Sequence, residues 1–328
     1  MSHAAEVFRK DYRLPAFLVD QVDLAFDIRE RTTVQARLQL RRNPAVAIAD
    51  EPLVLDGRGF DLLEVAVDDR RLDVGDYQRT DDRLQIAVVP DRFTLRIVTQ
   101  LDPEQNTTLE GLYRSGSMLC TQCEARGFSR ITYYPDRPDV LSRFSVRVEA
   151  DAQRFPVLLS NGNPVESGAL PDGRHYTVWD DPFLKPCYLF ALVAGDLACI
   201  EDHYTTASGR DVALRFYVDH GNEARVPHAM ASLKRAMRWD EQVYGLEYDL
   251  DLYMVVAARD FNMGAMENKG LNLFNARYVL ASPQTATDAD YDGIESVIAH
   301  EYFHNWTGNR VTCRDWFQLS LKEGLTVF

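Results

Sequence analysis

The sequence contains no apolar run long enough to cross a membrane. None of its hydrophobic stretches approaches the roughly 20 residues of a membrane-spanning helix, and residues 1–17 include no continuous apolar segment of signal-peptide length. Cysteine is also sparse, with five in 328 residues. A small, odd number of cysteines in a chain without a signal sequence is typical of reduced thiols. We therefore expect a cytoplasmic protein with no membrane partner.

Basic residues are outnumbered. Lys and Arg total 36 against 50 Asp and Glu, which gives a formal charge of −14. A net negative field repels phosphate backbones, so we expect no nucleic-acid partner. The same field is compatible with attraction of a substrate's ammonium group.

The sequence lacks a second cysteine pair to accompany its one CxxC, formed by Cys120 and Cys123. A zinc ribbon would need that second pair, and a redox dithiol is expected beside a βαβ pattern, which this region does not show. We therefore interpret both cysteines as structural thiols.

The first half of the chain alternates apolar and polar residues. Large apolar side chains fall on every second position in 22–28 and again in 34–40, with a short polar break between them, which predicts a hairpin. Further strand candidates are 62–67, 84–89, 93–98 and 144–148. We predict an all-β domain over 1–196, built as an antiparallel sandwich or an open curved sheet.

The pattern changes after residue 196. A hairpin over about 203–218 is followed by a helical pattern over 223–244, where Gly245 suits a helix end, and by a buried strand over 252–257. Two more helices are expected at 292–305 and 320–327, the first capped by Asp290 or Asp292. Residues 197–328 are thus predicted to form a second, α+β domain.

Residues 300–304 form the motif HExxH. Positions four apart on a helix lie one above the other. His300 and His304 can therefore reach one ion at the roughly 2.0–2.1 Å that zinc requires. Glu301 lies at the edge of the same face, near the metal but free to act as a general base on a bound water.

Glu323 is the candidate third ligand. A catalytic zinc has three protein ligands and one open position. Eighteen residues separate Glu323 from His304, and the break at 307–309 lets the chain reverse. The helix at 320–327 would then pack beside the first and direct Glu323 toward the two histidines. We predict one Zn²⁺ per chain.

Upstream of HExxH, residues 264–268 read Gly-Ala-Met-Glu-Asn. This segment, HExxH and the later Glu resemble the zinc aminopeptidases of the aminopeptidase N family, which carry GxMEN, HExxH and the same spacing to a Glu. The similarity covers essentially the whole chain and extends to the bacterial members, the alanyl aminopeptidases, in 121–125, 131–144, 262–268 and 300–328.

The resemblance implies a saddle-like β domain followed by a thermolysin-like catalytic domain. It also implies that Glu124 and Glu267 bind the free amino group of a peptide. An ammonium in a partly desolvated pocket needs carboxylates nearby, and no internal amide carries that charge. Further substrate contacts are implied for Gln122, Met263, Gly264, Ala265, Met266 and Asn268.

The expected function is release of the N-terminal residue from peptides, with a zinc-activated water and Glu301 as general base. Two alternatives stay open: an epoxide hydrolase of the leukotriene A4 hydrolase type, which shares these motifs, and a non-catalytic member or inactive fragment. Family members are much longer than this chain, which stops five residues after Glu323. We therefore expect a fragment with an incomplete catalytic domain, the oxyanion-stabilising residue beyond residue 328, and a monomer.

Overall fold

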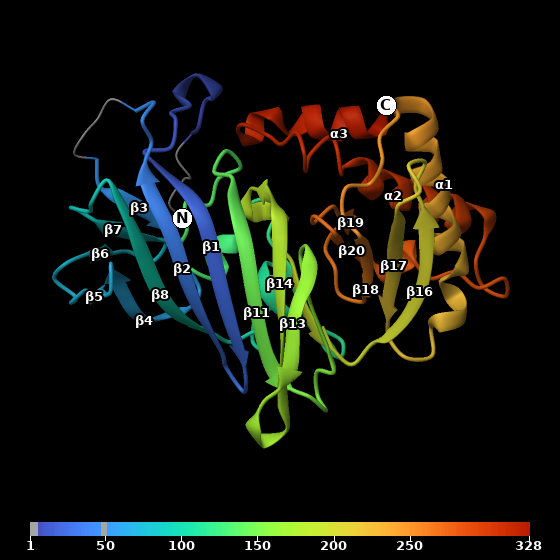
Figure 1. Ribbon diagram of the computed structural model, residues 1–328, viewed down its shortest axis with the longest axis horizontal. Coiled ribbons are helices and arrows are strands. Elements are labelled where there is room, and N and C mark those ends of the chain that lie inside the picture. The colour runs from blue at the N-terminus through green and yellow to red at the C-terminus, as the bar shows by residue number, and fades with distance from the viewer. Residues whose placement is uncertain (1–5, 47–50) are drawn as a thin grey trace.

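The computed structural model describes residues 6–46 and 51–328. Figure 1 shows long strands running through the N-terminal two thirds of the chain and a helix-containing part at the C-terminal end. Within the described residues, the strands form an eight-stranded, a four-stranded, a five-stranded and a three-stranded sheet. No helix in the described part of the chain has the length and apolar character that a bilayer crossing demands.

The eight-stranded sheet forms one face of the N-terminal part. Its strand order is β13-β14-β11-β1-β2-β8-β4-β5. Buried and exposed positions alternate along its long strands, as the sequence predicts for a sheet with one face on the core. In chain order the strands are β1 Phe17–Ile28, β2 Thr32–Arg42, β4 Asp61–Val67, β5 Arg70–Arg71, β8 Arg92–Leu101, β11 Ser142–Asp151, β13 Asn163–Ala169 and β14 Arg174–Lys185.

One pair of strands departs from the antiparallel arrangement predicted for the N-terminal domain. β1 and β2 form the expected hairpin, but β1 also pairs with β11 in parallel, with Val22 opposite Phe144. A parallel pair cannot be joined by a tight turn and needs a long crossover. Here β2 to β10 lie between the two strands in the sequence, so the alternation within each strand carries no information about this pairing.

Two smaller sheets complete the β-rich part. One has the order β12-β15-β10-β9, and the other has the order β3-β7-β6. Their bounds are β3 Leu53–Asp56, β6 Gln78–Arg79, β7 Arg83–Ile86, β9 Gly111–Ser115, β10 Met118–Gln122, β12 Val157–Ser160 and β15 Leu192–Gly195. Strand β10 is buried along its whole length, and it places Glu124 just beyond its end.

The five-stranded sheet belongs to the C-terminal part and has the order β16-β17-β18-β20-β19. Its strands are β16 Ala198–Thr205, β17 Asp211–Val218, β18 Leu252–Ala258, β19 Ala265–Met266 and β20 Leu271–Asn275. Sheet membership therefore changes between Gly195 and Ala198. The domain limits 1–196 and 197–328 remain a prediction, and this change falls beside them.

Three α-helices lie in the described C-terminal part: α1 Pro227–Tyr244, α2 Asp288–Phe303 and α3 Leu319–Val327. Gly245 ends α1 in the left-handed conformation, as expected. Helix α2 begins earlier than predicted, because Thr287 and Asp290 form a reciprocal capping box. Short 3₁₀ turns are η1 Arg9–Asp11, η2 Phe128–Arg130, η3 Pro171–Gly173, η4 Cys187–Leu189, η5 Glu223–Arg225, η6 Ala276–Tyr278 and η7 Trp316–Gln318.

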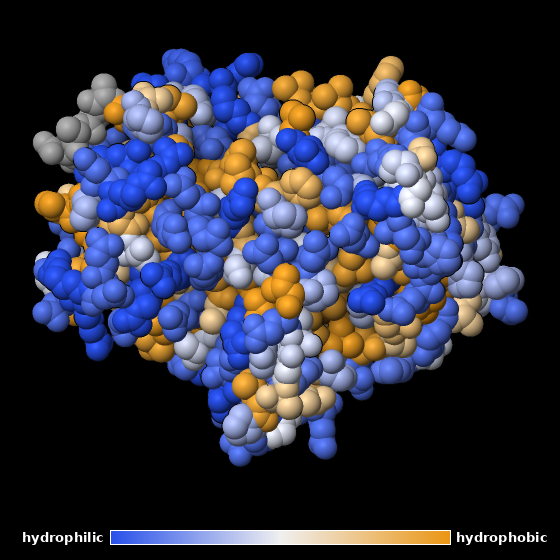
Figure 2. All heavy atoms as spheres, viewed as in Figure 1, coloured by the Kyte–Doolittle hydropathy of each residue, from blue (hydrophilic) through white to orange (hydrophobic). Residues whose placement is uncertain are grey.

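Two apolar cores hold these layers together. The larger one fills the β-rich part and reaches into β18 and β20, so the two parts share buried contacts. The smaller one lies between the five-stranded sheet and helices α1 and α2. Figure 2 shows apolar side chains gathered on the surface along the edge where Figure 1 places α3. Leu321, Leu325 and Phe328 are among the exposed apolar residues there.

Candidate metal centre

Three predicted ligands meet at the junction of α2 and α3. The Nε2 atoms of His300 and His304 lie 3.0 Å apart. One carboxylate oxygen of Glu323, Oε2, lies 3.3 Å from Nε2 of His300 and 3.4 Å from Nε2 of His304. The three donor atoms therefore form a nearly equilateral triangle, two of them from the last turn and the C-cap of α2 and one from α3.

This triangle has the size of one face of a zinc coordination tetrahedron. Zinc binds nitrogen and carboxylate oxygen at about 2.0–2.1 Å, which separates tetrahedral ligands by about 3.3–3.4 Å. The donor set, two imidazoles and a carboxylate, is also one that zinc uses in hydrolytic enzymes. The residues present thus fit a zinc ion, and all three of them line the adjoining cavity.

His304 is held in one orientation by the turn that follows α2. Its Nδ1 lies 2.8 Å from the carbonyl oxygen of Thr307 and 3.1 Å from the hydroxyl of Thr326. Donation from Nδ1 to that carbonyl leaves Nε2 unprotonated and able to bind a metal. Gly308 makes this turn possible: its φ is +139°, and an added Cβ would lie 3.0 Å from Nδ1 of His304.

Glu301 points into the same region from α2. Its carboxylate is buried, and Oε2 has no hydrogen-bond partner among the described residues. Burial, together with the nearby charge of Glu267, raises the pKa of Glu301 well above its usual value. A buried carboxylate with an unsatisfied oxygen beside a metal position is placed to accept a proton.

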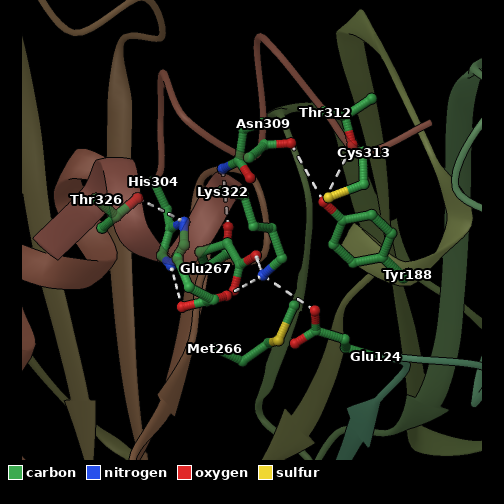
Figure 3. A network of polar contacts seen from close by, with 12 residues as sticks. Glu124, Tyr188, Met266, Glu267, His304, Asn309, Thr312, Cys313, Lys322 and Thr326 are labelled. Atoms are coloured by element: carbon green, nitrogen blue, oxygen red, sulfur yellow. Dashed lines mark hydrogen bonds and ion pairs between the residues drawn. The ribbon is translucent and has the colours of Figure 1, made fainter. Parts of the chain in front are cut away.

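A second group of carboxylates faces the metal position from the other side. Glu124 follows β10, Glu267 follows β19, and the ammonium of Lys322 lies between them (Figure 3). Burial and repulsion by Glu267 raise the pKa of Glu124 to about 7, although Lys322 opposes the shift. Burial also disfavours ionised Glu267, but His304 and Lys322 outweigh it and hold the pKa of Glu267 below its usual value.

Small-ligand sites in general occupy cavities of about 300–1,000 Å³, and the cavity at this centre measures about 630 Å³. Its walls bring together both carboxylate groups and the HExxH residues. Five of the predicted substrate-binding residues line it: Glu124, Met263, Gly264, Ala265 and Glu267.

The other three predicted substrate-binding residues lie behind the cavity wall. Gln122, Met266 and Asn268 are each at most 1% exposed, and none of them lines the cavity. The Gln122 amide nitrogen lies 3.4 Å from the sulfur of Met263 and 3.6 Å from that of Met266. In this arrangement they support the wall, and their contact with substrate stays a prediction.

Sequence reasoning missed several residues of the site. Lys322 precedes Glu323 and is buried among carboxylates, and Trp316, Leu319, Ser296 and Val297 line the cavity. Only Lys322 could have been found from the sequence, because it is a charged residue directly beside a predicted ligand. The other four have no such signal, because their positions follow from how η7, α2 and α3 pack.

The comparisons with known proteins identify the family of this chain. The family model described as the Peptidase M1 N-terminal domain matches residues 20–189, and the Peptidase family M1 domain matches residues 228–328. The chain belongs to peptidase family M1. The predicted fold class is thereby confirmed: a β-rich M1 N-terminal domain is followed by the first part of an M1 catalytic domain.

Individual M1 relatives are similar along almost the entire chain. Aminopeptidase N of Caulobacter vibrioides is 60% identical over 97% of this chain and 36% of its own length. Aminopeptidase N of Escherichia coli is 58% identical over 98% of this chain and 36% of its own length. The crystal structure of Legionella pneumophila aminopeptidase A in complex with aspartic acid matches with a TM-score of 0.94 and 40% identity, covering 97% of this chain and 37% of that one. The chain therefore spans little more than a third of the length of these M1 proteins.

Proposed function

We propose that the protein is a zinc aminopeptidase that binds one Zn²⁺ through His300, His304 and Glu323 and removes the N-terminal residue from peptides. The observation that carries this proposal is the triangle of donor atoms, with separations of 3.0, 3.3 and 3.4 Å. The aminopeptidase names of the M1 relatives support the same reaction.

The chain's own residues supply the proton chemistry. A zinc ion at this centre supplies Lewis acidity toward a water molecule and toward the scissile carbonyl. Glu301 accepts the proton of the attacking water and then delivers it to the leaving amine. The burial of Glu301 favours this role, because it keeps bulk solvent away from the carboxylate.

Glu124 and Glu267 restrict the reaction to chain ends. Both carboxylates line the cavity that contains the metal position. A charged N-terminal ammonium can bind there through charge-assisted hydrogen bonds, and an internal peptide bond offers no such charge. Holding the ammonium fixes which peptide bond reaches Glu301 and the ion.

Strand β19 offers the peptide a backbone partner. It is the last strand of the five-stranded sheet, and in the described structure it pairs only with β20. Gly264 and Ala265 line the cavity on this side. An extended peptide can therefore add to the sheet beside β19 by backbone hydrogen bonds.

The proposal is tested by measuring zinc content and the hydrolysis of alanyl-arylamide on the same zinc-loaded protein. We expect close to one zinc per chain and a chelator-sensitive release of alanine that is lost when the substrate's amino group is acetylated. Bound zinc with epoxide opening instead of alanine release would support the epoxide hydrolase alternative. Bound zinc with neither activity would support a non-catalytic role.

Glu301→Gln is the sharpest single substitution for this mechanism. We expect zinc binding to be retained and turnover to fall by about 10²–10⁴-fold, the usual contribution of a general base. Glu295→Gln is a matched control, because Glu295 lies on the same helix but is about half exposed and pairs with Arg235. Turnover of the Glu301 variant equal to that of the control would remove Glu301 from the role of base.

We also propose that the protein is monomeric and cytoplasmic and acts on peptides with a free N-terminus. The free thiols of all five cysteines support a reducing compartment. Size-exclusion chromatography with light scattering tests the first of these proposals, and cell fractionation tests the second.

A further inference from the structure

One buried lysine joins the two sides of the site. Lys322 is 3% exposed. Its Nζ lies 2.6 Å from Oε1 of Glu267, 2.6 Å from Oε1 of Glu323 and 3.0 Å from Oε1 of Glu124. Figure 3 shows the ammonium between Glu267 and Glu124, with the metal-facing His304 on the other side of Glu267. A buried ammonium is costly unless it is paired, and here three carboxylates surround it.

Lys322 contacts only one of the two carboxylate oxygens of Glu323. Oε1 of Glu323 accepts from Lys322, whereas Oε2 faces the two histidine nitrogens. The lysine therefore fixes the carboxylate so that one oxygen is directed at the ion. Such an outer contact orients a ligand and affects metal affinity, typically by about 10- to 100-fold when it is lost.

Lys322 also sets the charge that remains for a substrate. Four carboxylates surround the cavity at this point, from Glu124, Glu267, Glu301 and Glu323. Ionised Glu124 and Glu267 carry two negative charges, and the ammonium of Lys322, which contacts both, balances one and leaves one. One N-terminal ammonium balances that charge, so the centre is matched to a monocationic chain end.

We propose that Lys322 is a positioning residue that acts on both sides of the site: it orients Glu323 toward the metal and leaves Glu124 and Glu267 with one unbalanced negative charge for the substrate's ammonium. The inference rests on the proposed aminopeptidase function for its second half, and on the metal site alone for its first half.

The test uses Lys322→Met, which keeps a long apolar side chain and removes the charge, and Lys322→Ala, which leaves space for a small amine. We expect zinc affinity, measured by competition with a chromogenic chelator, to fall about 10- to 100-fold in Lys322→Met. At saturating zinc, kcat/KM for alanyl-arylamide should fall at least about 100-fold, because removing one partner of a buried charge group leaves the others uncompensated.

Ethylammonium distinguishes positioning from general support of the fold. In Lys322→Ala, millimolar ethylammonium should restore part of the activity by occupying the vacated position. In the unmodified protein it should inhibit, since it competes with the substrate's ammonium for Glu124 and Glu267. Lys234→Met is the matched control, because Lys234 pairs with Asp202 on the surface, and this variant should keep unaltered zinc affinity and kinetics.

The two proposals fail in different ways. Unaltered zinc affinity and kcat/KM in Lys322→Met, or the same ethylammonium response in Lys322→Ala and the unmodified protein, would overturn the inference. Absence of zinc-dependent alanine release from the unmodified protein would overturn the proposed function, and the zinc affinities would still decide whether Lys322 orients Glu323. If Lys322→Ala does not fold, the affinity and kinetics of Lys322→Met decide the inference.

Discussion

The site has two sides that are built in different ways: a metal side, which holds the three proposed zinc ligands, and an amine side, which holds the two carboxylates proposed to bind the substrate's ammonium. On the metal side, His300 and His304 come from one helix, and Glu323 comes from the short helix packed against it. On the amine side, Glu124 follows a strand of the N-terminal part, and Glu267 follows the edge strand of the C-terminal sheet. Local helix geometry thus defines one side, while contact between distant segments defines the other.

Because of this difference, different structural changes would displace the residues of each side. The two histidines keep their separation as long as α2 stays helical. Glu124 keeps its place only while the β-rich part and the C-terminal part share their buried contacts. A change that loosens the boundary between these parts should therefore weaken recognition of the N-terminus before it releases the metal.

The strongest way to break the metal side is Glu323→Ala. We expect zinc affinity to fall by more than the roughly 10- to 100-fold typical of losing an outer contact, because a direct ligand is removed. The same variant frees Lys322 of one partner, so its effect should exceed that of Lys322→Met. Elemental analysis after dialysis measures the zinc that remains, and unchanged zinc content would count against Glu323 as a ligand.

Glu124→Gln should weaken binding of the substrate's ammonium without affecting zinc binding. Losing one charged hydrogen bond costs about 1.5–3 kcal/mol, so kcat/KM for a substrate with a free amino group should fall about 10- to 100-fold. Zinc content should not change, because Glu124 lies outside the donor triangle. Steady-state kinetics and zinc analysis test this prediction. The control is Glu110→Gln, because Glu110 lies in the same part of the chain and pairs with Arg130. A loss of zinc in Glu124→Gln would show that the two sides are not separable.

The sequence was sufficient for most of the metal side. HExxH needs only a helix to bring its histidines together, and a turn at Gly308 followed by a second helix was enough to place Glu323. The start of α2 was misplaced, because a capping box with an Asp at its third position is a weaker pattern than an Asp at the cap itself.

The amine side could not be obtained from spacing. Glu124 and Glu267 are separated by more than 140 positions in the sequence, and their assignment came from resemblance to a family. The role of Lys322 and the cavity contacts of Trp316 depend on how α3 and η7 pack on the β-rich part. Pairing of β1 with β11 was missed for the same reason, since alternation identifies a strand but not its neighbour.

Gly308→Ala should have a smaller effect on the metal side than the loss of a ligand. A Cβ at this position would lie 3.0 Å from Nδ1 of His304, and the φ of +139° is unfavourable for alanine. We expect a loss of about 1–3 kcal/mol in the free energy of unfolding and a weaker zinc affinity. Gly209→Ala is the control, since its φ is +87° but nothing lies near its added Cβ. Denaturant unfolding and chelator competition should show lower stability in both variants and weaker zinc binding only in Gly308→Ala.

The smallest expected effect is on the pH dependence of stability, and it involves Asp240 on α1, which lies outside both sides of the site. Its carboxylate accepts a hydrogen bond of 2.7 Å from the indole of Trp306, just after HExxH. Burial raises the pKa of Asp240 from 3.8 to about 6, despite that hydrogen bond. The folded state thus binds the proton more tightly than the unfolded state, so this group's contribution to stability falls as pH rises from about 4 to about 6.

Asp240→Asn should remove this part of the pH dependence, because the amide keeps an acceptor for Trp306 but does not ionise. Above pH 6 we expect the variant to be more stable than the unmodified protein by about 1 kcal/mol, a value reduced for partial solvent screening. The difference should vanish near pH 4. Thermal unfolding between pH 4 and 7 measures it, with the exposed Asp251→Asn as control. A constant difference across that range would show that folding does not shift the pKa of Asp240.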